Sequence, residues 1–165
     1  MACTYCNSIK TDRTVNAGNL NDYFWADTDN TARAFFYEKD RAPQVSANLS
    51  TIDKNIAANT LALTGLDREP THPKFNIKTD ERWHERNEAW RKAERARTHL
   101  SAQATDLMRS QIIDTATSTG FWSVWMTVFQ DYTDMRRRLI EAFQSTCKDC
   151  FDLDTQPIPR ADGKI

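Results

Sequence analysis

The chain has 165 residues, with 22 Lys and Arg against 23 Asp and Glu, which gives a formal net charge of -1. This length fits one domain with a core of its own, and a hydrophobic content of 39% argues against a fully disordered chain. The balanced charge disfavours a dedicated nucleic-acid binder, and no apolar run approaches the ~18 residues of a membrane span. The first ten residues lack a signal-peptide core, so we expect the chain in the cytoplasm or within an assembled particle such as a virion.

The residue types favour an all-α fold. Four Gly and five Pro provide few turns for a sandwich or barrel of many short strands. Only four Val stand against 18 Ala, although strands prefer β-branched residues and helices tolerate alanine best. The composition therefore predicts a chain built mainly from helices.

Residues 1–26 are predicted to form an irregular arm, because residues 16–22 are rich in turn-forming Asn, Asp and Gly. The arm ends in three adjacent aromatic residues, Tyr23, Phe24 and Trp25. Aromatic side chains in such a cluster bury a large apolar area. We expect them to dock either on the chain's own core or on a neighbouring subunit.

Two shorter helices are expected next, over residues 28–39 and 44–63. Asp27 or Asp29 can cap the first helix, and Pro43 ends it. Apolar residues at helical spacing define the second helix: Val45, Leu49, Ile52, Ile56 and Leu63. Gly65 occupies the position of a left-handed helix cap.

A long third helix is predicted from Thr79 or Asp80 to about Thr117, with a densely charged first half that is typical of a solvated face. Residues 118–120 interrupt the pattern. A fourth helix follows, with a wide apolar face formed by Phe121, Val124, Trp125, Val128, Phe129, Tyr132, Met135, Leu139 and Phe143. Extending that face reaches Cys147 and Cys150, so we expect both thiols to point toward the core.

The expected fold is therefore a long antiparallel helical hairpin, made by the third and fourth helices, with two shorter helices. An irregular amino-terminal arm and an extended carboxy-terminal tail complete it. The predicted organisation is an arm over 1–26, a helical domain over 27–151 and a tail over 152–165. The tail should be mobile unless a partner holds it.

The four cysteines form two C-x-x-C pairs, Cys3 with Cys6 and Cys147 with Cys150. Two such pairs can supply the four thiolates of a closed structural zinc site, here a clasp between the arm and the end of the fourth helix. About 140 residues separate the pairs, far more than the usual ~15–20. One or two disulfides, or four reduced thiols, are the alternatives.

Two weaker patterns have structural explanations. Glu81-x-x-His84 copies the ligand spacing of di-iron bundles, but it is the one such pair on a predicted helix, and such a site needs two. The basic triplet Arg136, Arg137 and Arg138 could contact phosphate. We favour arginine stems lying on apolar surface with their charged heads in water.

No catalytic motif is present, and the 17 aromatic residues exceed what a small helical core needs, as at protein interfaces. The leading hypothesis is a non-enzymatic structural or assembly subunit of a larger homo- or hetero-oligomeric complex, such as a phage virion. The alternative is a small intracellular zinc-binding adaptor or regulator clasped by the cysteine pairs. A third, weaker hypothesis is a helical-bundle metalloenzyme.

Overall fold

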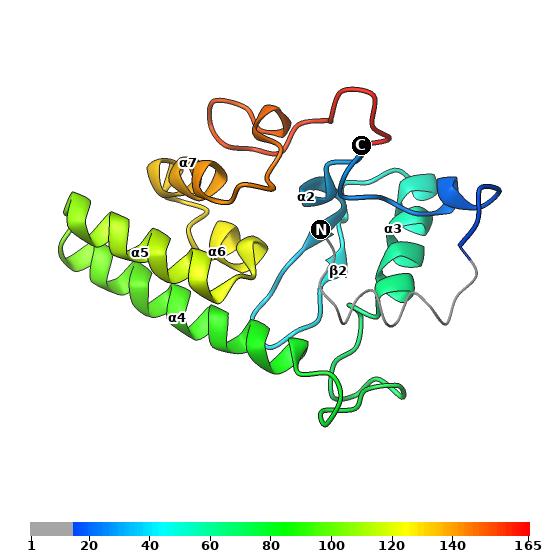
Figure 1. Cartoon of the computed structure of the whole chain (residues 1–165), viewed down its shortest axis with the longest axis horizontal. Coiled ribbons are helices and arrows are strands. Elements are labelled where there is room, and N and C mark those ends of the chain that lie inside the picture. Colours follow the sequence, from blue (N-terminus) through cyan, green and yellow to red (C-terminus); the bar gives the residue numbers. More distant parts are fainter. Residues whose placement is uncertain (1–14) are drawn as a thin grey trace. The chain divides into compact units, whose positions relative to one another are not determined.

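A computed structural model describes residues 15–165 and shows a mainly helical protein with one small sheet (Figure 1). The described chain divides into two compact units. Unit 1 contains residues 15–81 together with Pro157–Ile165, and unit 2 contains Arg82–Gln156. The mainly helical prediction is confirmed, whereas the sheet departs from a purely all-α fold. No helix among the described residues has both the length and the apolar composition to cross a bilayer.

Unit 1 combines short elements with one substantial helix. Its elements are the 3-10 turn η1 (Leu20–Asp22), helix α2 (Thr31–Ala34), strands β1 (Phe35–Phe36) and β2 (Gln44–Val45), and helix α3 (Thr51–Thr64). The two strands pair antiparallel, with Phe35 opposite Val45 and Phe36 opposite Gln44.

The helix predicted over 28–39 is wrong in extent, because it is reduced to the single turn of α2. Asn30 begins this turn by accepting a hydrogen bond from the N–H of Ala32. The chain then becomes extended at Phe35 (φ -127°, ψ 146°), as aromatic residues on a pleated surface prefer. Asp40, which adopts a left-handed conformation (φ 57°), lies in the connection that brings β2 back beside β1.

The helix predicted over 44–63 also starts later, since Val45 is used for strand pairing. Ser50 begins α3, and its side chain accepts a hydrogen bond from the N–H of Asp53 at 3.1 Å, which satisfies a free donor of the first turn. Gly65 ends α3 in the left-handed region (φ 61°) and donates its N–H to the carbonyl of Leu61. The predicted glycine cap is therefore confirmed.

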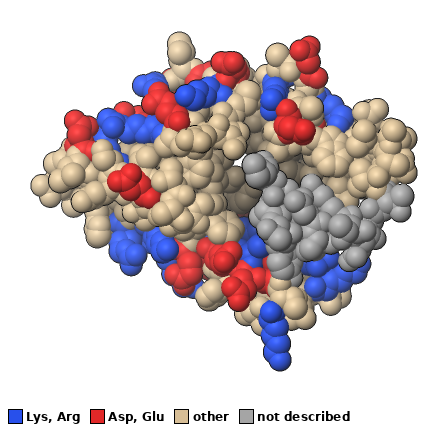
Figure 2. All heavy atoms as spheres, in the orientation of Figure 1, with Lys and Arg blue, Asp and Glu red and all other residues tan. Residues whose placement is uncertain are grey.

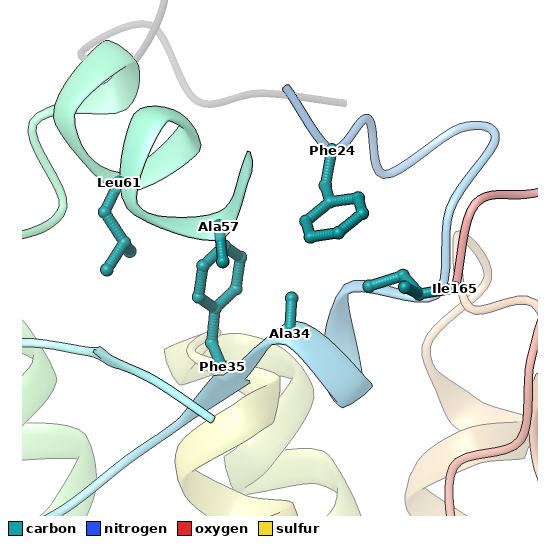
Figure 3. Packing of buried hydrophobic residues seen from close by; sticks show 6 residues of the cluster. All are labelled: Phe24, Ala34, Phe35, Ala57, Leu61 and Ile165. Atoms are coloured by element: carbon teal, nitrogen blue, oxygen red, sulfur yellow. The ribbon is translucent and has the colours of Figure 1, made fainter. Parts of the chain in front are cut away.

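The core of unit 1 joins residues that lie far apart in the sequence (Figure 3). Its buried members are Phe24, Ala34, Phe35, Ala57, Leu61 and Ile165. Phe24 is 3% exposed, and its N–H donates to the hydroxyl of Thr60 at 2.8 Å. Of the two expected destinations for the aromatic cluster, Phe24 therefore occupies the chain's own core.

The last residues pack on the same unit, which corrects the prediction of a tail that only a partner would hold. Ile165 is 4% exposed, and its main-chain oxygen accepts a hydrogen bond from the N–H of Asn30 at 3.1 Å. The N–H of Lys164 donates to the buried carboxylate of Asp29 at 2.7 Å. Asn30 also donates its side-chain amide to the carbonyl of Ile158. These bonds hold the end of the chain against residues 23–30.

The regular elements of unit 2 are all helical. Its elements are α4 (Arg82–Ala102), α5 (Asp106–Thr119), α6 (Trp122–Val128), α7 (Thr133–Ala142) and the 3-10 turn η2 (Lys148–Cys150). α4 packs against α5 and α6, and α7 packs against α5 and α6. Figure 1 shows α4 and α5 side by side as an antiparallel pair.

The single third helix predicted up to Thr117 is wrong, because the chain folds back between α4 and α5. Thr105 begins α5 from an extended conformation, and its hydroxyl accepts a hydrogen bond from the N–H of Met108. Asp106 follows in the first turn, where a negative charge favours the positive end of the helix dipole. Gly120 (φ 78°) ends α5, as the interruption at 118–120 predicts.

The predicted fourth helix is likewise divided into α6 and α7, but its apolar face is largely confirmed. Trp125, Phe129 and Leu139 are completely buried, whereas Tyr132 is only half-buried. Phe129 stacks on Trp125 with 6.4 Å between ring centroids and meets Tyr132 edge to face at 5.8 Å. These rings cross the break between the two helices, so the apolar pattern continues where the helix does not.

Leu139→Ala should therefore lower the free energy of unfolding of unit 2 by about 2–5 kcal/mol, because it removes buried methyl groups and leaves a cavity. Leu107→Ala makes the same chemical change at a side chain that is 70% exposed, and it should shift stability by less than about 0.5 kcal/mol. Urea unfolding followed by tryptophan fluorescence measures both. Equal effects of the two substitutions would contradict the core assignment.

Candidate functional site

Two of the four predicted zinc ligands, Cys147 and Cys150, lie in the described chain, whereas Cys3 and Cys6 lie outside the described residues. Cys147 precedes the turn η2 and Cys150 ends it. Cys150 is 2% exposed and Cys147 is half-buried. No disulfide joins the two. Whether all four sulfurs meet stays a prediction.

The prediction that a continuous fourth helix points both thiols toward the core is wrong. α7 ends at Ala142, and Phe143 is already extended (φ -85°, ψ 99°). The helix therefore does not carry its apolar face as far as Cys147 and Cys150. The burial of Cys150 comes from the separate turn η2, which a continuous helical pattern does not foresee.

The cysteine pair offers half of a structural zinc site. Within residues 15–165, no three His, Cys, Asp or Glu side chains are grouped so that they could hold a metal ion. A structural zinc needs four ligands, so Cys147 and Cys150 would require two more from Cys3 and Cys6 or from another chain. Glu81 and His84, the other predicted metal pattern, are both exposed.

The basic triplet of α7 serves the chain's own architecture. Arg136 is 7% exposed, and its Nη2 donates to the carbonyl of Thr155 at 2.6 Å. Arg137 donates to the carbonyl of Leu153 at 3.2 Å. Both arginines thus hold the segment 151–156, which we call the carboxy-terminal loop, against α7. The expectation that all three charged heads lie in water is wrong for Arg136.

Burial affects the charge of Arg136. Desolvation lowers the pKa of its guanidinium below the ordinary value, and the nearby charge of Asp152 acts in the opposite direction. Arginine remains protonated in proteins, so the loop is held by a buried positive charge. Arg138, the third member, pairs instead with Asp134 at 3.3 Å and Asp106 at 3.3 Å and connects α7 to α5.

A basic groove lies between α4 and α5, with a volume of about 180 Å³. Lys92, Arg95 and His99 form its α4 wall, and Met108 and Ile112 contribute apolar surface from α5. The three basic residues recur at i, i+3 and i+7 and therefore share one face of α4. Among the residues that the structure describes, no carboxylate lines this groove or pairs with Lys92 or Arg95.

Charge elsewhere on unit 2 is mixed. In the part of Figure 2 that contains α4–α7, basic and acidic side chains are interspersed over the visible face. Arg91, for example, pairs with Glu88 one turn earlier on α4. The groove differs from this background because Lys92 and Arg95 have no such carboxylate partner within residues 15–165.

The sequence places Lys92, Arg95 and His99 on a charged helix but does not predict a groove there. The groove forms because the chain folds back at residues 103–105, which a continuous third helix hides. The dipeptide Thr105–Asp106 is the signal that could have revealed it, since threonine caps a helix and an acidic residue favours its first turn. The exposed Leu153 in the carboxy-terminal loop has no comparable signal.

Arg136→Met should release the carboxy-terminal loop, because methionine keeps much of the apolar stem but cannot donate to Thr155. We expect the amides of Asp154 and Gln156, which are bonded to the carboxylate of Asp152, to exchange hydrogen about tenfold faster or more. Arg138→Met, which leaves the loop contacts intact, is the matched control. Unchanged exchange in Arg136→Met would show that the loop holds itself.

No family model, no curated protein and no solved structure matches this chain. The function is therefore inferred from the chain's own residues and their contacts.

Proposed function

We propose that the chain is a non-enzymatic structural or assembly subunit of a larger complex, such as a phage virion. The observation that carries this proposal is the strong exposure of large aliphatic side chains on well-formed elements. Ile52 on α3 is 72% exposed, Leu107 on α5 is 70% exposed, and Leu153 in the carboxy-terminal loop is 90% exposed. Removing such surface from water favours association.

Single exposed apolar side chains are ordinary on protein surfaces. What distinguishes these three is the ordered backbone that holds them. Ile52 and Leu107 lie at the second positions of α3 and α5, and Leu153 lies in a loop held by two arginines. Such side chains reach a partner with little loss of backbone freedom, which favours binding. These features suit protein contacts better than catalysis.

Size fractionation of extracts from the native source tests the proposal. We expect the chain to migrate well above its own mass of 19.0 kDa and to occur in fixed stoichiometry with other subunits, as measured by quantitative mass spectrometry. A triple variant, Ile52→Lys, Leu107→Lys and Leu153→Lys, should keep its stability within about 1 kcal/mol but enter the complex poorly.

Asn55→Lys, Gln103→Lys and Gln130→Lys add the same charge at three exposed polar positions and form the matched control. This control variant should enter the complex as the unmodified chain does. A chain that migrates only at its monomer mass in native extracts would contradict the proposal.

The second candidate function is a zinc-binding adaptor or regulator. It is favoured by the position of Cys147 and Cys150 at the two ends of one turn, since each half of a four-cysteine zinc site uses two sulfurs from one short segment. In this function the zinc ion would be structural, and Cys3 and Cys6 would supply the other two thiolates.

Zinc analysis after dialysis distinguishes this candidate. The adaptor function requires one zinc per chain, with four sulfurs about 2.3 Å from the metal by X-ray absorption. Cys147→Ser should then abolish retention of the ion, whereas Ser145→Ala, at a neighbouring exposed position, should not. Loss of zinc from the unmodified chain on dialysis would contradict this function and leave the assembly proposal in place.

A further inference from the structure

The carboxy-terminal loop presents one leucine between two acids. Leu153 is 90% exposed, the highest value among large apolar side chains in residues 15–165. Asp152 precedes it, Asp154 follows it, and both acids are exposed. An apolar tip flanked by negative charge is the chemistry that a basic groove with an apolar floor would accept.

The loop is held in one shape before any partner arrives. Asp152 bonds to both ends of the turn, because its carboxylate accepts from the N–H of Asp154 at 3.0 Å and of Gln156 at 2.7 Å. Its own N–H donates to the carbonyl of Gln156. Arg137 donates to the carbonyl of Leu153 itself. The leucine is therefore displayed on a preorganised turn, which reduces the entropy lost on binding.

The groove between α4 and α5 has the complementary properties. Its volume of about 180 Å³ is of the same order as a closed cavity of about 150 Å³ that admits benzene, and the groove is open on one side, so a single side chain is the size of group it suits. The half-buried Met108 offers apolar contact, and the buried Ile112 lies beneath it at the floor of the groove. Lys92 and Arg95 lie where they can face the acids that flank an inserted leucine.

The carboxy-terminal loop does not dock in the α4–α5 groove of its own chain. The groove is lined only by residues of α4 and α5, and Figure 1 shows α7 between this helix pair and the loop that follows α7. Arg109 and Ile113 of α5 face α7, whereas Met108 and Ile112 line the groove. The loop that is bonded to α7 and the groove therefore lie on different faces of α5. Their complementarity can be used only between two copies.

We propose that the carboxy-terminal loop of one copy docks in the α4–α5 groove of a second copy, with Leu153 lying on Met108 above the buried Ile112. Asp152 and Asp154 then lie beside Lys92, Arg95 and His99. The contact is heterologous, since it joins two different surfaces, and it leaves one free loop and one free groove at the ends of each pair. This inference rests on the proposed assembly function and names a second copy as one of its partners.

Sedimentation velocity of the purified full chain tests the inference between about 10 μM and about 1 mM protein, because a single small contact is weak. We expect pairs and larger species that increase with concentration. They should diminish when the ionic strength rises from about 0.02 to about 0.3 M, since salt screens the charges at the rim of the contact.

Two variants remove opposite halves of the contact. Leu153→Lys removes the loop's apolar tip and adds a charge that the basic groove repels. Lys92→Glu with Arg95→Glu makes the groove repel the loop. Each should raise the dissociation constant about tenfold or more, the factor that corresponds to ~1.4 kcal/mol. Ile77→Lys, at an apolar side chain that is 55% exposed, and Arg91→Glu, at an exposed site outside the groove lining, are the matched controls and should behave as the unmodified chain.

Mixing the two defective variants gives the decisive result. One variant retains its groove and the other retains its loop, so the mixture should form one-to-one pairs and no larger species. Failure to pair, or association of either variant alone at the unmodified strength, would overturn the inference. An unmodified chain that stays monomeric up to about 1 mM would overturn it too, while its fixed stoichiometry in native complexes would keep the assembly function standing.

Discussion

The buried guanidinium of Arg136 determines where the chain goes after α7. It lies in the interior of unit 2 at 7% exposure and binds the carbonyl of Thr155, which has a left-handed conformation (φ 63°). Its Nε atom has no hydrogen-bond partner among residues 15–165. Burying a charge with incomplete hydrogen bonding is costly. The cost is offset partly by the 2.6 Å bond to Thr155 and by the charge of Asp152. The buried guanidinium thereby holds the carboxy-terminal loop in one conformation.

That loop conformation matters because the contact we infer is small. Complete burial of one leucine contributes about 1.5–3 kcal/mol, and exposed ion pairs add about 0–1 kcal/mol each. Association costs an estimated ~4–15 kcal/mol in lost freedom. A flexible loop would add an ordering cost that such a contact could not offset. The proposed docking would therefore be weak between free chains, and it would become effective in an assembly whose other contacts raise the effective concentration toward about the millimolar range.

Sequence patterns predict which side chains are buried better than they predict where helices stop. The apolar face that starts near Phe121 identifies Trp125, Phe129 and Leu139 correctly, because burial depends on periodicity that survives a break between helices. The breaks themselves depend on local competition, as where Phe35 pairs with Val45 in a sheet. The groove depends on the fold-back between α4 and α5, and the burial of Arg136 depends on a contact with Thr155, 19 residues later. A charged helix reads the same in sequence whether its face is simply solvated or lines a groove. A basic triplet reads the same whether its arginines face water or bind a loop.

The cysteine pair and the exposed leucine belong to one continuous segment, and this connects the two candidate functions. Cys150 ends the turn η2 and stands three residues before Leu153. A metal ion or another thiol bound at Cys147 and Cys150 would fix the start of the carboxy-terminal loop, while Arg136 fixes its end at Thr155. Ligation at the cysteines would then reduce the entropy that the loop loses on docking. Zinc binding and assembly are thus compatible physically, since the same segment can carry both.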